Sequence, residues 1–202
     1  MIEKLVVGIS GASGAIYGAA LIGELLRQPL EVHVVVTPDG RQVMAHELGS
    51  GGRLDAILDQ RWGGRRHSQA RMIEHAADNF FAPPASGSFR HQGMVVAPCS
   101  VKTLGAIAGG LADNLMVRAA DICLKERRPL ILVPRETPLS RIHLHNMLRV
   151  TDAGATVLPP APAFYFQPES IQDMVDFVVG RILDQLGVAH NLLAQWGDDD
   201  KA

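Results

Sequence analysis

A charged pair, Arg135-Glu136, directly follows an apolar segment at 130–133. The planar N–H donors of an arginine in such a place can hold a phosphate or a ring carbonyl. A glutamate beside it can take up or return a proton during a reaction. The same two side chains would also serve as a structural ion pair, and their spacing leaves both interpretations open.

Small residues and hydroxyls follow another apolar segment, 5–9, in the run Ser10-Gly11-Ala12-Ser13-Gly14. Glycines let a phosphate approach backbone N–H groups closely at a helix N-terminus. The run departs from the dinucleotide pattern G-x-G-x-x-G, because serines stand at 10 and 13. The second apolar segment ends at Thr37 instead of the acidic residue that binds an adenosine ribose. A mononucleotide such as FMN therefore fits better than NAD, and a plain helix-capping turn is the alternative.

Two more hydroxyls, Ser100 and Thr103, flank Val101 and Lys102 at the start of a predicted helix. One of them can cap the helix. Together with the positive end of the helix dipole they can also hold a phosphate or a ring carbonyl. Both interpretations remain open at this point.

Three cations lie on predicted helices. Arg118 and Lys125 are two helical turns apart, on one face and about 10 Å from each other along the axis. Asp121 lies between them and can pair with either. Arg181 borders an apolar stripe, so its stem can lie along the surface or its guanidinium can enter a pocket. A solvated charged face is the alternative for the first two.

Strand and helix patterns that alternate along the chain must position these side chains. The predicted strands are 5–9, 31–36, 94–97, 130–133 and 155–158, and the predicted helices are 15–27, 40–48, 101–108, 113–125, 139–150 and 170–186. This alternation indicates a single-domain α/β fold with a Rossmann-like, doubly wound parallel sheet. The loops that follow the strands then meet at one edge of the sheet. Residues 49–70 mix glycine with arginine, which predicts a mobile surface loop with a short helix near 54–58.

Composition excludes several classes of protein. The formal net charge of −2 argues against binding of nucleic acid or membrane through bulk charge. No secretory signal and no apolar run of spanning length is visible. Cys99 and Cys123 stand in apolar segments, as buried thiols in a reducing compartment do, so we expect a cytoplasmic protein. His143 and His145 are not part of an H-x-x-x-H or H-E-x-x-H pattern, and no metal site is predicted.

Long stretches of the chain resemble the flavin prenyltransferases of the UbiX-like family. The matching stretches are VGISGASGAIYG (7–18), ASGSF (85–89), GMVVAPCSVKTLGAIAGG (93–110), RAADICLKERRPLILVPRETPL (118–139), PPAPAFYFQP (159–168), GRILDQLGV (180–188) and NLLAQWG (191–197). The stretch 49–67 aligns with nothing in the family pattern, and Asn114 stands where a glycine is frequent. Phe80 and Phe81 are the aromatic candidates for covering a prenyl group.

The resemblance implies an activity. It implies transfer of a dimethylallyl group from dimethylallyl monophosphate to N5 and C6 of reduced FMN, without a metal, which makes prenylated FMN for UbiD-type decarboxylases. It also implies a homo-oligomer, commonly a dodecamer, with sites at subunit interfaces. We expect a flavin-binding domain over 1–190 and a C-terminal tail over 191–202.

The resemblance also implies site residues. The residues that match FMN contacts are Gly11, Ala12, Ser13, Thr37, Ser100, Val101, Lys102, Thr103 and Arg135. The residues that match positions around the prenyl phosphate are Tyr165, Arg181, Arg118 and Lys125. Glu136, Ser13 and Lys125 are the catalytic candidates, with Glu136 expected to transfer protons. Two rival interpretations are an FMN-dependent cysteine decarboxylase of the same broad fold, and a flavin carrier or decarboxylase helper subunit without catalysis.

Overall fold

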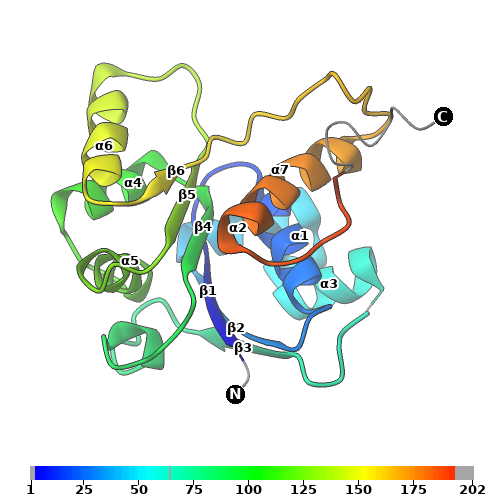
Figure 1. The fold of residues 1–202 in the computed structure, drawn as a ribbon, viewed down its shortest axis with the longest axis horizontal. Coiled ribbons are helices and arrows are strands. Elements are labelled where there is room, and N and C mark those ends of the chain that lie inside the picture. Colours follow the sequence, from blue (N-terminus) through cyan, green and yellow to red (C-terminus); the bar gives the residue numbers. More distant parts are fainter. Residues whose placement is uncertain (1–2, 64, 194–202) are drawn as a thin grey trace.

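A single parallel sheet organises the protein. The computed structural model describes residues 3–63 and 65–193. In that part of the chain the sheet has six strands in the order β3-β2-β1-β4-β5-β6 (Figure 1). The strands are β1 Glu3–Ile9, β2 Leu30–Val36, β3 Arg71–His75, β4 Met94–Cys99, β5 Leu130–Pro134 and β6 Thr156–Val157. The predicted Rossmann-like sheet is confirmed, and its order reverses between β1 and β4, where sheets of this kind bind ligands.

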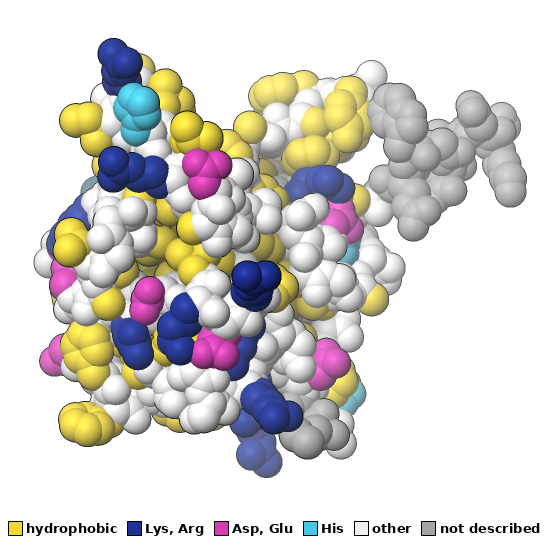
Figure 2. Space-filling view, turned by 60° about the vertical axis from the view of Figure 1, so that its left-hand side comes forward, with side chains coloured by type: hydrophobic (Ala, Val, Ile, Leu, Met, Phe, Trp, Pro, Cys, Tyr) yellow, Lys and Arg dark blue, Asp and Glu magenta, His cyan; other side chains and the backbone are white. Residues whose placement is uncertain are grey.

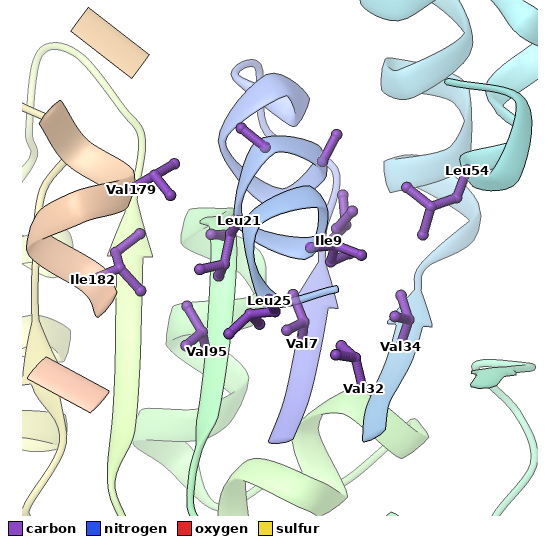
Figure 3. Close-up of a cluster of buried hydrophobic side chains, with 14 of the residues drawn as sticks. Val7, Ile9, Leu21, Leu25, Val32, Val34, Leu54, Val95, Val179 and Ile182 are labelled. Carbon is purple, nitrogen blue, oxygen red and sulfur yellow. The ribbon is translucent and has the colours of Figure 1, made fainter. Parts of the chain in front are cut away.

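Helices cover both faces of the sheet (Figure 1). One face carries α1 Ala15–Leu25, α2 Pro38–Leu48, α3 Leu54–Trp62 and α7 Ile171–Leu186, and the other carries α4 Val101–Gly109, α5 Leu115–Lys125 and α6 Arg141–Asp152. Alternate strand residues enter opposite cores: Val7 packs with α1 and α7, whereas Val6 packs with α5. Figure 3 shows the first core, in which Leu21 and Ile182 approach the strands from their helices.

Helix α1 lies very close to the sheet. A Cβ at Gly18 would lie 2.2 Å from the carbonyl oxygen of Ala97, so only a glycine permits this approach. The same approach brings the start of α1 beside the end of β4. The loops that follow β1 and β4 are therefore neighbours in space.

The stretch 49–75 has more regular structure than the sequence predicted. The short helix expected near 54–58 is present as α3, which extends to Trp62 and buries Leu54, Ile57 and Leu58, and a 3-10 turn, Ser50–Gly52, precedes it. Glycines and arginines on both sides of this short apolar pattern obscured the full length of the helix. Strand β3 was not predicted, because at the edge of the sheet its side chains are mostly exposed.

Four helices begin at residues other than those predicted from the sequence, and local hydrogen bonds explain the differences. Asn114 caps α5 by accepting a hydrogen bond from Val117 N at 3.0 Å, so the helix begins at Leu115 and not at Asp113. Ser140 and Ser170 form capping boxes, which place the starts of α6 and α7 one residue after each serine. Helix α2 begins at Pro38, earlier than expected, because Thr37 caps it. The predicted tail, 191–202, lies outside the described residues beyond Leu193.

A histidine cluster joins β2 to β3 near the sheet edge. His33 Nε2 donates to Glu31 Oε1 at 2.8 Å, and its Nδ1 therefore accepts from His75 Nε2 at 2.8 Å. Protonation of both rings would set two N–H donors against each other. Burial lowers the pKa of His75, and the charge of His33 lowers it further. Burial also lowers the pKa of His91, whose ring stacks on Phe89.

Acid is expected to destabilise the fold through this cluster. Below the unperturbed pKa of 6.5, the unfolded chain binds protons at His75 and His91 that the folded chain does not. The free energy of unfolding therefore decreases as the pH decreases, by up to about 1.4 kcal/mol per pH unit for each additional proton that the unfolded chain binds. Denaturant unfolding of the protein and of His75→Gln between pH 7 and 5 measures this. The variant should show the shallower slope, His46→Gln is the exposed control, and equal slopes would contradict the prediction.

Candidate functional site

A cavity lies at the carboxyl ends of β1, β2 and β4, at the point where the strand order reverses. Its volume is about 160 Å³. Five residues expected to bind a ligand line it together: Gly11, Thr37, Ser100, Lys102 and Thr103. The cavity is also lined by Pro38, Asp39, Ala77, Ala106, Asp113, Asn114 and Val117. Topology thus brings together loops that are far apart in sequence.

Two helix N-termini meet at this cavity. Thr37 Oγ1 accepts from Gly40 N at 3.0 Å at the start of α2. Ser100 Oγ accepts from Thr103 N at 3.2 Å at the start of α4 and donates to Thr103 Oγ1 at 3.1 Å. The capping role left open for Ser100 is therefore present, and Thr103 Oγ1 keeps its own proton to donate. Hydroxyls and the positive ends of two helices make the cavity suited to an anion.

Ser10 ties the loops together and is not a free donor. Its side chain is fully buried. Its Oγ donates to Pro98 O at 2.8 Å and accepts from Ser100 N at 2.7 Å. Ser10 therefore fixes the loop after β1 against the loop after β4, and it does so without reaching the cavity surface.

The N-terminus of α1 does not offer the anion site that its glycines suggested. The Glu47 carboxylate, from α2, accepts from Gly14 N at 3.0 Å and from Ala15 N at 3.0 Å. A carboxylate already neutralises this helix end, which leaves the N-termini of α2 and α4 better suited to an anion. No local signal in the sequence identified Glu47, because the contact joins two different helices.

The two members of the charged pair after β5, Arg135 and Glu136, have different partners. Arg135 Nε donates to Ser13 O at 3.1 Å, so the loop after β5 meets the loop after β1. Glu136 is exposed, and its Oε1 accepts from Thr137 N at 3.0 Å. Each side chain thus bonds to a backbone group, and the two do not pair with each other. Ala12 is buried and Val101 is half-buried beside these loops.

Tyr165 and Arg181 share a second cavity. It has a volume of about 1170 Å³ and is lined by α7, the segment before it and the segment after it. Arg181 Nη1 pairs with Asp184 Oδ2 at 2.6 Å. Three other carboxylates line this cavity: Glu169, Asp173 and Asp176. Its own charge is therefore mainly negative.

Arg118 and Lys125 lie on the other face of the sheet. Arg118 Nη1 pairs with Asp121 Oδ2 at 2.9 Å, as the helical spacing predicted. Lys125 Nζ pairs with Glu126 Oε1 at 2.6 Å instead of with Asp121. Because α5 and α7 pack against opposite faces, one chain does not bring these two cations to Arg181. Phe80 and Phe81 are both exposed and line neither cavity.

Both cysteines lie in the interior of the fold. Cys99 and Cys123 are buried, as expected, and burial raises the pKa of each thiol to about 12. No group of three or more His, Cys, Asp or Glu side chains within 3–63 and 65–193 is placed to hold a metal ion. In the same ranges no helix has the length and apolar character needed to cross a membrane.

Comparison with known proteins decides the family. The family model described as Flavoprotein matches residues 2–183. The flavin prenyltransferase UbiX of Halalkalibacterium halodurans is 45% identical over 194 residues, which cover 96% of this chain and 93% of that protein. The chain belongs to the UbiX family of flavin prenyltransferases. The UbiX of Pseudomonas aeruginosa is also 45% identical, over 97% of this chain and 95% of that protein.

Solved structures of UbiX proteins share the fold. AnUbiX (PadA1), crystallised in complex with FMN and dimethylallyl pyrophosphate, has a TM-score of 0.87 and 41% identity, with 98% of each chain covered. The dodecameric FMN-dependent UbiX-like decarboxylase of Escherichia coli O157:H7 has a TM-score of 0.86 and 43% identity, with 96% of this chain and 98% of that chain covered. The FMN-dependent cysteine decarboxylase TvaF, at 19% identity and a TM-score of 0.58, shares only the fold.

Proposed function

We propose that this chain transfers the dimethylallyl group of dimethylallyl monophosphate to N5 and C6 of reduced FMN and releases phosphate. One observation carries the proposal. Four strand-end loops converge at the reversal of strand order, in a chain that is 45% identical to UbiX proteins over nearly its full length. Bound FMN would supply the electron-rich ring that accepts the prenyl group.

The residues present fit FMN. Hydroxyls of Thr37, Ser100 and Thr103 at two helix N-termini suit its phosphate. The cavity of about 160 Å³ is smaller than the roughly 300–1,000 Å³ of a typical ligand pocket, so it would hold the phosphate end alone. Gly11 and Lys102 line the same cavity, and Ser13 and Arg135, which touch each other, would hold the ring together with Ala12 and Val101.

The prenyl phosphate requires cations, because an allylic monophosphate leaves poorly unless its growing negative charge is neutralised. Arg118, Lys125 and Arg181 would supply that charge, and Tyr165 would donate a hydrogen bond. Since α5 and α7 lie on opposite faces of one chain, we place the complete site between subunits of a homo-oligomer, a dodecamer by analogy with the E. coli relative.

Exposed apolar side chains support such an assembly. They gather on α6 (Ile142, Leu144, Leu148) and on the segment before α7 (Phe164, Tyr165, Phe166). Figure 2 shows hydrophobic side chains filling a hollow between the two upper projections of the molecule. Monomeric proteins rarely expose large apolar patches. The product would pass to a UbiD-type decarboxylase, and the domain of residues 1–190 would carry the site.

An anaerobic reaction tests the proposal. Protein, reduced FMN and dimethylallyl monophosphate are mixed, and the flavin is then extracted for mass analysis. A flavin heavier by one isoprene unit is expected, and a parallel reaction with the diphosphate shows which ester is preferred. Tightly bound but unmodified flavin would favour a carrier. A separate reaction with oxidised FMN and a cysteinyl peptide tests the rival, and oxidative decarboxylation of the peptide there would favour the decarboxylase.

A further inference from the structure

The chain after α7 folds back onto that helix. Gly187 ends α7 in a left-handed conformation, and Val188 N donates to Leu183 O at 3.0 Å. Gly180 makes room for the returning segment, since a Cβ there would lie 2.6 Å from Leu193 Cγ and 3.2 Å from His190 Cε1. The His190 side chain is only 9% exposed as a result. This segment is therefore packed, and its polar groups have defined positions.

Asp184 connects that segment to Arg181. Its Oδ1 accepts from His190 Nε2 at 3.0 Å, and its Oδ2 accepts from Arg181 Nη1 at 2.6 Å. An exposed i,i+3 ion pair usually contributes little, because two mobile side chains must be ordered to make it. Here a nearly buried histidine already holds the carboxylate. Arg181, whose side chain is 50% exposed, thereby gains a fixed partner.

We propose that Asp184 is a positioning residue that orients Arg181 for the substrate phosphate, with His190 holding Asp184 in place. The inference rests on the proposed function, in which Arg181 binds that phosphate. Without Asp184 the long arginine side chain would rotate freely, and phosphate binding would have to order it. A fixed carboxylate removes part of that cost and leaves the other N–H donors of the guanidinium for the ligand.

A purely electrostatic role for Asp184 predicts the opposite effect on phosphate binding from a positioning role. Asp184 shares its cavity with Glu169, Asp173 and Asp176, and each carboxylate repels an anionic ligand. If Asp184 acted only through its charge, neutralising it would improve phosphate binding. If it positions Arg181, neutralising it would weaken phosphate binding. The direction of the change in KM thus separates the two roles.

Asp184→Asn tests the inference in the assembled enzyme. The KM for dimethylallyl monophosphate should rise about tenfold, because loss of preorganisation weakens binding. The kcat should also fall, because Arg181 stabilises the charge that grows on the leaving phosphate, whereas the Kd for FMN should change less than about twofold, because the cavity of Asp184 is separate from that of Thr37 and Ser100. Asp176→Asn is the matched control, since it removes a charge from the same cavity but bonds to Gln172 and not to Arg181. It should lower the KM. Asp184→Glu, which keeps a carboxylate, should restore part of the loss.

A double variant shows whether Asp184 acts through Arg181. Arg181→Met should raise the KM, and adding Asp184→Asn to it should cause no further rise. Two results would overturn this inference while leaving the proposed function in place. One is a KM for Asp184→Asn at or below the wild-type value. The other is a double variant in which the two substitutions multiply each other's effect on the KM. An unchanged KM in Arg181→Met would overturn the proposed role of Arg181, and the inference with it. Melting temperatures of all variants show whether a rise in KM merely follows unfolding.

Discussion

Replacement of Glu136 by glutamine is expected to slow formation of the prenylated flavin by about 100- to 10,000-fold, the usual contribution of a general acid or base. In the proposed reaction, bond formation at N5 and C6 removes one proton from each position. One proton must reach the departing phosphate and the other the central carbon of the prenyl group. Glu136 is exposed beside Arg135, which anchors the loop to Ser13, so its carboxylate is available for these transfers. Glutamine keeps the size of the side chain and an acceptor for Thr137 N but cannot carry the proton.

The defect should fall on the second bond more than on the first, because ring closure at C6 must release a proton from carbon. A flavin joined at one position and the finished product are isomers, so mass alone does not separate them. Chromatography and absorbance spectra of an acid-quenched anaerobic time course do. Glu136→Asp, which keeps a titratable group, should retain more activity than Glu136→Gln. Normal rates of both bonds in Glu136→Gln would remove this residue from the mechanism.

Four of the six strands, β1, β2, β4 and β5, were predictable because they are buried on both faces, as in β5, where all five residues are buried. Such strands are continuous apolar runs in sequence. The two edge strands, β3 and β6, have one neighbour each, and β3, which was not predicted, also carries Arg71, Glu74 and His75. Its pairing with β2 depends on backbone hydrogen bonds and on the His33–His75 contact. Neither is visible as a hydrophobic pattern.

The convergence of the strand-end loops was predictable from topology alone, since all parallel strands end at one edge. The contact of Glu47 with the start of α1 was not, because it depends on how α2 packs beside α1. The face of the sheet on which each cation lies could not be predicted from the sequence either. They follow from the strand order, which places α5 and α7 on opposite faces, and alternating patterns do not specify that order.

The placement of α5 and α7 on opposite faces of the sheet leads to a second prediction, which concerns Arg118 and Arg181. Arg118→Met and Arg181→Met should each lower activity by about 100-fold or more, because each removes a cation from the leaving phosphate. If the two side chains enter one site from different subunits, chains carrying either change should complement each other. Co-expression in equal amounts with random assembly should leave about a quarter of the sites with both arginines. Activity of the mixed oligomer should therefore recover to about that fraction of the wild-type value.

A second mixture controls for nonspecific recovery. Arg118 and Lys125 are on the same helix, so they enter any site from the same subunit. Every site in a mixture of Arg118→Met and Lys125→Met chains then lacks one of the two cations, and no activity should return. Recovery in this mixture, or none in the first, would contradict a site shared between subunits in this way. Mass spectrometry of the intact oligomers verifies that both chains are present, so that an absence of recovery reflects the site and not failed mixing.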